Sequence, residues 1–273
     1  MRTRPGSVRW LALALVSSIA GPLACSGDDG PSSAAETSGD GDSSAPEPGT
    51  PAPGWESAFV DGGVGFACDD DEASLIAAGV PAVGFADAVV YVGFEQIGDN
   101  QNPLVARFDA GAQTYCQRHE TEGPDGRALG LTWDGGELAY VVYTVVGGGT
   151  SLEGKGGWLA SYAPGAISGG GPKVSVVGRV NVGDGSLERA SFVIAVLSDG
   201  KVNSHTPRAA PTVLADGNVE FLGASAHKPI DADGQTAMAC GDYPFDSRYV
   251  LGPDLSALAC ASCSNCAAQQ PCE

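Results

Sequence analysis

The sequence predicts an all-β domain that follows a long polar N-terminal segment. Short runs of β-branched and aromatic residues recur from Val89 onward, and turn-forming Asp-Gly pairs and Gly triplets separate them. No window of helical length keeps an apolar period of about 3.6 residues, apart from a single turn expected at Glu72–Ala78. We therefore expect a strand-rich fold with short connections.

The chain begins with a pattern typical of a secretory signal. Arg2, Arg4 and Arg9 precede an apolar run over residues 10–20, which is long enough for the hydrophobic core of an export signal and too short to cross a bilayer. Residues 1–24 are therefore predicted to be a signal peptide, and we do not count them as part of the fold.

Cys25 ends a short motif, Pro22-Leu23-Ala24-Cys25. The motif resembles the lipobox of bacterial lipoproteins, in which the cysteine is acylated and becomes the new N-terminus. This resemblance implies lipid chains such as palmitate on Cys25, anchoring to the cell envelope and, with Ser26 in the next position, the outer membrane. Ordinary signal-peptidase cleavage after Ala20 is the alternative, and it would release a secreted soluble protein.

Residues 25–54 have the composition of a disordered tether. From Ser26 to Pro53 the segment contains only Ser, Gly, Pro, Asp, Glu, Ala and Thr. Such a composition cannot bury enough apolar surface to offset the entropy lost on ordering. We expect a spacer, stiffened by prolines near its C-terminal end, that holds the domain away from the membrane.

Strands are expected where β-branched and aromatic residues cluster, and turns where Gly follows Asp or another Gly. In chain order, the expected strands are residues 89–93, 104–108, 138–143, 158–162, 174–177, 192–197, 219–222 and 248–251. The expected turns are Asp134-Gly135, Asp184-Gly185, Asp199-Gly200, Asp216-Gly217, and the triplets Gly147–Gly149 and Gly169–Gly171.

Residues 55–256 are expected to form one domain, because all-β units of this length commonly share one core. A repeat indicates how the strands are grouped, since its spacing of about fifty residues falls in the range of four-stranded propeller blades. The order of its motifs is similar to the bacterial SBBP-type β-propeller repeat. That resemblance implies a small or partial β-propeller, and a two-sheet β-sandwich made of the same strands is the alternative. The repeat relates Val89–Gly93, Leu104–Ala112 and Ala128–Gly135 to Leu138–Val142, Trp158–Ala166 and Phe192–Gly200.

Cysteine is the next constraint, with eight residues in the chain. An exported compartment favours their pairing as disulfides. If Cys25 is acylated, an odd number remains, and one thiol then has no partner. We expect Cys68 to pair with Cys116, and Cys240 with a cysteine of the C-terminal tail. The disulfide candidates are Cys68, Cys116, Cys240, Cys260, Cys263, Cys266 and Cys272.

Residues 257–273 form a cysteine-rich tail with the spacing Cys260-x-x-Cys263-x-x-Cys266. This spacing resembles the start of a bacterial ferredoxin motif, which implies an iron–sulfur cluster held by three thiolates. Zinc or copper, with Cys263 and Cys266 among the ligands, is a second hypothesis, because soft ligands select these ions. A dithiol redox pair of Cys260 and Cys263 is a third. We prefer a small disulfide-knotted tail to all three.

Two acidic segments contain candidate calcium ligands. Asp231-Ala-Asp233-Gly234 matches half of a calcium-binding loop, and residues 69–72 form an acidic cluster beside Cys68. Both patterns are incomplete. We therefore expect a turn at the first and a solvated helix N-terminus at the second, and keep a weak Ca²⁺ site at Asp231 and Asp233 as the alternative.

Catalytic patterns are sparse in this sequence. His119, His205 and His227 are the only histidines, they form no metal-ligand pair, and we expect each at the surface or in a turn. The sequence holds no Gly-x-Ser-x-Gly motif, no phosphate-binding loop and no dinucleotide fingerprint. No cofactor is therefore expected.

The charge and the missing motifs narrow the function. The net charge is −19, and removing the three arginines of the signal gives −22, so nucleic acids and anionic lipid surfaces would be repelled. Two classes remain. The first is a non-enzymatic binding or scaffold module, anchored to the membrane through Cys25, that presents a face to a protein, peptide or glycan. The second is an extracellular hydrolase or lyase, or a metal-dependent redox protein that uses the tail. The missing nucleophile, base and complete metal site favour the first.

Overall fold

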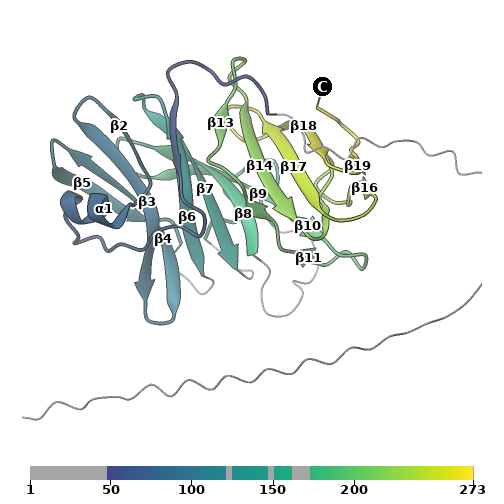
Figure 1. Cartoon of the computed structure of the whole chain (residues 1–273), viewed down its shortest axis with the longest axis horizontal. Coiled ribbons are helices and arrows are strands. Elements are labelled where there is room, and N and C mark those ends of the chain that lie inside the picture. The colour runs from purple at the N-terminus through teal and green to yellow at the C-terminus, as the bar shows by residue number, and fades with distance from the viewer. Residues whose placement is uncertain (1–47, 121–124, 147–150, 162–172, 273) are drawn as a thin grey trace, which may run out of the picture. The chain divides into compact units, whose positions relative to one another are not determined.

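A computed structural model describes residues 48–120, 125–146, 151–161 and 173–272, and it confirms the all-β class (Figure 1). Strands in antiparallel sheets make up about half of these residues, and the helix among them is α1 (Glu72–Ala78), at the position expected from the sequence. No helix in these ranges has the length and apolar character needed to cross a membrane. The signal, Cys25 and both Gly triplets lie outside the described residues.

The first sheet is a four-stranded meander that contains the expected strands 89–93 and 104–108. Each strand pairs with the next one along the chain, because tight turns connect them. Ala86, Gly98 and Gly111 supply the positive φ angles that these turns require. The strands of the first sheet are β2 (Ala82–Phe85), β3 (Ala88–Ile97), β4 (Asn100–Asp109) and β5 (Ala112–Arg118).

The second sheet repeats this meander and adds an earlier strand at its edge. The predicted Asp134-Gly135 and Asp184-Gly185 turns join its consecutive strands, and both glycines have a positive φ. The strands of the second sheet, in spatial order, are β1 (Glu56–Phe59), β6 (Gly126–Trp133), β7 (Leu138–Val146), β8 (Lys173–Asn181) and β9 (Leu187–Val193).

The third sheet is assembled from the last third of the chain, with two small ribbons beside it in sequence. Its strands are β12 (Thr206–Pro207), β13 (Thr212–Val213), β14 (Val219–Ser225), β17 (Phe245–Leu251) and β18 (Leu258–Cys263). One ribbon contains β10 (Ala195–Val196), β11 (Val202–Asn203) and β15 (Lys228–Pro229), and the other contains β16 (Ala239–Cys240) and β19 (Cys266–Ala267). The segment expected to be a separate tail therefore supplies an edge strand to the third sheet.

The described strands divide among more than two sheets, and none of these sheets closes on itself. One expected strand, residues 158–162, is wrong over the residues that can be described. Trp158 to Ser161 are irregular and make isolated backbone hydrogen bonds: Trp158 N donates to Leu255 O, and Leu159 O accepts from Phe192 N. These partners lie in different parts of the fold, so the segment links elements instead of extending one ladder.

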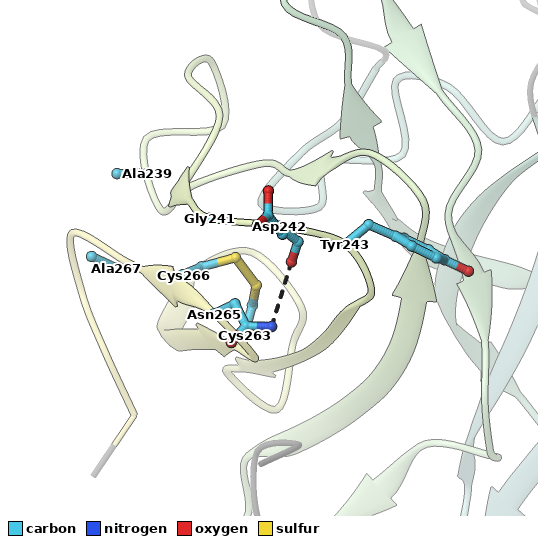
Figure 2. Close-up of a pocket in the computed structure, with 8 residues that line it drawn as sticks. All are labelled: Ala239, Gly241, Asp242, Tyr243, Cys263, Asn265, Cys266 and Ala267. Atoms are coloured by element: carbon cyan, nitrogen blue, oxygen red, sulfur yellow. Dashed lines mark hydrogen bonds between the residues drawn. A yellow bond between two sulfur atoms is a disulfide. The ribbon is translucent and has the colours of Figure 1, made fainter. Parts of the chain in front are cut away.

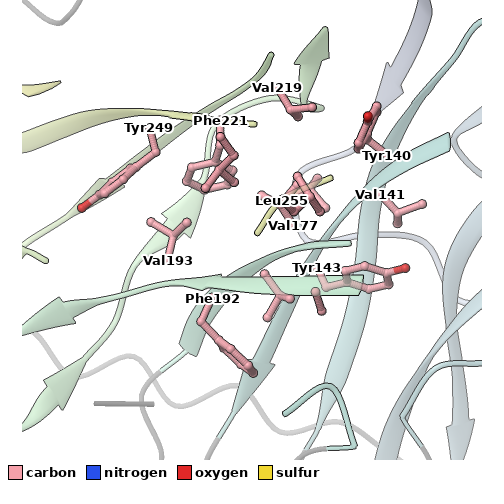
Figure 3. Close-up of a cluster of buried hydrophobic side chains, with 14 of the residues drawn as sticks. Tyr140, Val141, Tyr143, Val177, Phe192, Val193, Val219, Phe221, Tyr249 and Leu255 are labelled. Atoms are coloured by element: carbon pink, nitrogen blue, oxygen red, sulfur yellow. The ribbon is translucent and has the colours of Figure 1, made fainter. Parts of the chain in front are cut away.

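The main core lies on both faces of the second sheet. Strands β3 and β4 of the first sheet contact β6, while β12 of the third contacts β7 and β8. Central strand β7 is therefore buried almost throughout, which explains why Leu138–Val146 reads as a nearly continuous apolar run. Figure 3 shows Tyr143 and Phe192 from the second sheet in the same cluster as Phe221 and Tyr249 from the third.

A smaller cluster lies on the first sheet beneath α1. Asp71 caps the helix by accepting a hydrogen bond from Ser74 N, and Gly79 ends it with a φ of 71°. The helix buries only Leu75. The cluster consists of Phe66, Leu75, Val80, Tyr91, Leu104, Ala106 and Phe108, with Cys68 and Cys116 packed against it.

An N-terminal strap, residues 49–66, contacts all three main sheets. Its start joins the third sheet through Ala52 N, which donates to Val213 O, its middle forms β1 of the second sheet, and its end pairs with Phe94 of the first sheet. Glycine permits the close approach: a Cβ on Gly130 would lie 2.5 Å from Ala58 O. Ordered pairing therefore starts inside the segment whose composition predicts a tether.

Candidate functional site

Sulfur atoms from three cysteines lie close together beside the ribbon formed by β16 and β19. Cys240 on β16 lies directly opposite Cys266 on β19. Cys263 ends β18, and the two-residue turn Ser264-Asn265 brings the chain back to Cys266. Asn265 has a φ of 58°, a left-handed conformation that asparagine tolerates better than most residues. Cys266 is therefore a neighbour of Cys240 across the ribbon and of Cys263 across the turn.

The three Sγ atoms of Cys240, Cys263 and Cys266 all lie within 4.8 Å of one another, and we call them the sulfur trio. Cys266 is within bonding contact of both of the others, and Figure 2 shows its bond to Cys263. A disulfide sulfur is bonded to its own Cβ and to one other sulfur. The trio therefore holds one disulfide at a time, and the remaining sulfur is a thiol.

The other four cysteines of the described residues form two ordinary pairs. Cys68 bonds Cys116, as predicted, with a Cα–Cα distance of 5.6 Å, and Cys260 bonds Cys272 at 5.0 Å. Both distances fall within the usual range for disulfides. Pairing of Cys260 with Cys272 removes Cys260 from the Cys260–Cys263 redox pair that was the third hypothesis for the tail, and agrees with the preferred disulfide-bonded tail. It also removes Cys260 from the three thiolates that the ferredoxin-like spacing implied.

A cavity of about 580 Å³ opens beside the sulfur trio (Figure 2). Cys263 and Cys266 form part of its wall, with Asp242, Tyr243 and Asn265. The Tyr243 side chain is 65% exposed, and in Figure 2 it points away from the sulfurs. The amide of Asn265 lies 3.4 Å from the Asp242 carbonyl oxygen and links the two sides of the cavity. The cavity wall thus includes two of the three cysteines, of which Cys263 is 9% exposed.

The immediate surroundings of the trio favour neutral sulfur. The Ser264 carbonyl oxygen lies 3.1 Å from Cys263 Sγ and 3.4 Å from Cys266 Sγ. A carbonyl oxygen accepts hydrogen bonds, so it can hold a thiol proton but cannot stabilise a thiolate. Asp242 is the acidic residue of the cavity wall, and a carboxylate also opposes a second negative charge nearby. A thiol here is expected to react more slowly than one beside a cation.

Asp231 and Asp233, the candidate ligands of the alternative calcium site, make hydrogen bonds within a loop. Asp231 Oδ1 accepts from Ala232 N at 2.7 Å and from Gln269 N at 2.9 Å, so it attaches the tail to this loop. Asp233 Oδ1 accepts from the backbone N–H groups of Gln235 and Thr236. Among the described residues, the group that could hold a metal ion is the sulfur trio, which includes neither aspartate. These bonds match the expected turn and provide no separate calcium cage.

The acidic cluster beside Cys68 is likewise used for local structure. Asp70 Oδ2 accepts from Ala67 N at 2.7 Å, and Asp71 Oδ1 accepts from Ser74 N at 2.8 Å. The hydrogen bonds from Ser74 lower the pKa of Asp71. Glu72 accepts from the Tyr91 hydroxyl at 3.1 Å. This cluster is the helix N-terminus that the sequence predicted.

Two of the three histidines are buried, which contradicts the expectation of surface positions. His119 is 9% exposed: its Nε2–H donates to Gly185 O at 2.7 Å, and its Nδ1 accepts from the Tyr143 hydroxyl at 2.8 Å. Burial lowers the pKa of His119 to about 4. His227, in contrast, lies in the turn between β14 and β15, as expected.

His205 forms a serine–histidine arrangement that no sequence pattern had indicated. Its Nε2 lies 2.7 Å from Ser247 Oγ and its Nδ1 lies 3.1 Å from Ser175 Oγ, with 42 and 30 residues of separation. His205 is fully buried, Ser247 is 2% exposed, and burial lowers the pKa of His205 to about 3. A nucleophile must meet its substrate, so this pair serves to satisfy buried polar groups in the core.

No protein-family model, no curated protein and no solved structure matches this chain. The sulfur trio and its cavity are therefore interpreted from their own geometry and chemistry.

Proposed function

We propose that this chain is an exported lipoprotein whose β domain acts as a binding or scaffold module at the cell envelope. The observation that supports this proposal best is disulfide pairing within the domain, because disulfides persist in oxidising compartments outside the cytosol. This support is independent of the signal-like pattern in residues 1–24. It comes from cysteines that lie far from that pattern in the sequence.

Lipid attachment at Cys25 would place the domain on the outer membrane through the tether. More than one acyl chain is needed for stable anchoring, and the lipobox-like motif implies such a modification. The module then presents exposed edges and loops to a protein, peptide or glycan. Stacked antiparallel meanders suit such a platform, and we regard them as blades of a partial propeller related to the SBBP-type repeat.

A non-enzymatic role is favoured over a hydrolase or lyase by the position of the polar groups. The serine–histidine arrangement is buried, and the carboxylates named from the sequence hold loops and a helix end. The second candidate function, redox or metal chemistry in the tail, has one specific observation in its favour, the sulfur trio.

The anchoring proposal is tested by the intact mass of the mature chain purified from membranes. We expect an N-terminus at Cys25 that carries a diacylglycerol and a further acyl group, and we expect Cys25→Ser to move the protein from the membrane to the soluble fraction. A Cys68→Ser variant is the matched control and should stay in the membrane fraction. An unmodified chain that begins at Gly21 would overturn anchoring and favour the secreted form.

A further inference from the structure

We propose that the sulfur trio is a thiol–disulfide exchange site, in which Cys266 is the shared sulfur and the released thiol reacts with small disulfide compounds through the neighbouring cavity. The proposal extends beyond an inert envelope module, because it assigns a reactive site and a class of ligand. It rests on the proposed function in one respect, because acylation of Cys25 removes the eighth cysteine as a partner for the third sulfur.

The count of sulfurs is the first step. Cys68–Cys116 and Cys260–Cys272 are complete pairs, which leaves the three members of the trio for one remaining disulfide. An odd number of thiols in one place cannot be fully paired. Oxidation of the trio therefore always produces one disulfide and one thiol.

The identity of the shared sulfur follows from the two contacts of Cys266. In one state Cys266 bonds Cys240 across the β16–β19 ribbon, and Cys263 is the thiol. In the other state Cys266 bonds Cys263 across the Ser264-Asn265 turn, and Cys240 is the thiol. A thiolate of Cys240 converts the second state into the first: it forms a bond to Cys266 Sγ as the Cys266–Cys263 bond breaks, and Cys263 leaves as a thiolate. Electrons balance without an external oxidant.

The cavity selects which state reacts with outside molecules. Cys263 and Cys266 line the cavity, whereas Cys240 does not. In the state with a Cys240–Cys266 disulfide, the residue that carries the thiol is therefore Cys263, which lies in the cavity wall and is 9% exposed. Its thiolate attacks one sulfur of a disulfide RS–SR, so that a Cys263–SR bond forms and the RS–SR bond breaks. The released RS⁻ takes a proton from water. The compound's own disulfide is the oxidant, and the product is a mixed disulfide on the protein.

Charge decides which disulfide compounds react fastest. Asp242 is the charged residue of the cavity wall, and the whole chain has a net charge of −19. An acidic site raises the local concentration of cations and repels anions. The preferred ligand class is therefore a cationic disulfide such as cystamine, followed by the neutral 2-hydroxyethyl disulfide and then the anionic oxidised glutathione.

The pairing is tested on the full chain, kept native and unreduced, by labelling with N-ethylmaleimide and locating the adduct by fragmentation. We expect one adduct in the trio, divided between Cys240 and Cys263, and none on Cys266. Cys240→Ser and Cys263→Ser should each abolish labelling of the trio, because each leaves a complete pair with Cys266. Cys260→Ser is the control, and it should leave the trio's adduct in place while adding one at Cys272.

Three results would overturn the proposal. An adduct on Cys266 would remove its role as the shared sulfur. A trio with no adduct, through a bound metal ion or another pairing, would remove the free thiol. An adduct that stays on Cys240 alone would show that the disulfide does not move. Near-ultraviolet circular dichroism of each variant establishes that it is folded, and Cys240→Ser and Cys263→Ser test the same count independently.

The ligand class is tested by the rate of mixed-disulfide formation at low salt and pH 8. We expect cystamine to react roughly tenfold faster than oxidised glutathione, in line with electrostatic focusing at charged sites, and the difference to shrink in high salt as charges are screened. Equal rates, or a faster reaction with oxidised glutathione, would overturn the charge selection. The Asp242→Asn variant should reduce the rate difference between cystamine and oxidised glutathione. It should leave the pattern of N-ethylmaleimide labelling unchanged.

Discussion

The two cysteine regions of this domain differ in one respect that changes their chemistry. The Cys68–Cys116 region has two sulfurs, which pair over 48 residues of sequence and pack against a cluster of buried side chains. The C-terminal region has five sulfurs, of which Cys260 and Cys272 pair over 12 residues, and the other three, those of Cys240, Cys263 and Cys266, lie within 4.8 Å of one another. An even number produces an inert crosslink. An odd number leaves a thiol beside a disulfide, and this makes the second region reactive.

The supporting structure differs as well. Around Cys68, the helix α1 and the first sheet provide an apolar cluster that would hold the chain in place. Around Cys240, the ribbon strands β16 and β19 have two residues each, β18 pairs with β17 of the third sheet, and Cys263 belongs to the main core cluster. The first bond reinforces the smaller cluster beneath α1, whereas the second region lies against the main one.

Removing each complete disulfide gives the largest expected effect and tests this difference. The entropy of closing the longer loop predicts a loss of about 4 kcal/mol in the free energy of unfolding for Cys68→Ala with Cys116→Ala, and about 3 kcal/mol for Cys260→Ala with Cys272→Ala. Urea unfolding of the two double variants measures both. A larger loss for the shorter loop would mean that the Cys260–Cys272 bond stabilises the native packing of the tail, in addition to the entropy of closing its loop.

The packed cluster of the first region is tested by a pair of adjacent residues in α1. Leu75 is 1% exposed and Ile76 is 65% exposed. Leu75→Ala should lower the free energy of unfolding by about 3 kcal/mol, because it removes buried methyl groups and leaves a cavity. Ile76→Ala, the matched control, should change it by less than about 0.5 kcal/mol. Similar values for the two variants would show that α1 does not depend on its packing against the first sheet.

The free energy of unfolding should decrease in acid because two histidines, His119 and His205, are buried. Burial depresses the folded-state pKa of His119 to about 4 and of His205 to about 3, below the unfolded value of about 6.5. The unfolded chain therefore binds more protons as the pH falls from 6.5 towards 4, and stability is lost over that window. Between pH 7.5 and 5 the loss is on the order of 2 kcal/mol for each histidine.

Urea unfolding at both pH values measures this loss in the parent chain and in His119→Gln and His205→Gln. Each single variant should remove the contribution of one histidine to the stability lost between pH 7.5 and 5. The double variant should remove both contributions. A pH dependence that is unchanged in His119→Gln would mean that the pKa of this histidine is the same in the folded and the unfolded chain. An unchanged pH dependence in His205→Gln would mean that His119 alone accounts for the loss of stability in acid.

Local patterns predicted much of the fold. The Glu72–Ala78 helix, the strands β3, β4, β7 and β8 and the Asp-Gly turns were all expected, because capping residues, β-branched runs and positive-φ glycines act over a few positions. Residues 158–161 carried the same kind of apolar pattern but formed no strand, because their hydrogen-bond partners come from Leu255 and Phe192 instead of a ladder. A strand needs a neighbour, and a local pattern does not supply one.

The candidate site was only partly predictable. The tail cysteines were singled out, and the expected pairing of Cys240 with one of them agrees with the Cys240–Cys266 contact. The sequence did not show which tail cysteine this is, because the pairing of β16 with β19 places Cys266 opposite Cys240, more than twenty residues away. His205 and Ser247 show the same limit, since 42 residues separate two side chains that lie in hydrogen-bond contact. Such contacts have no signature in neighbouring residues.

By itself, the sequence determined that this chain forms strands and turns, carries a strong negative charge and has a cysteine-rich tail. These properties depend on composition and on neighbours along the chain. Only the tertiary structure decided which sheets form, which histidines lose contact with water and which three sulfurs meet at Cys266. Those outcomes depend on the packing of segments distant in sequence, because burial and covalent pairing are set by distance in space.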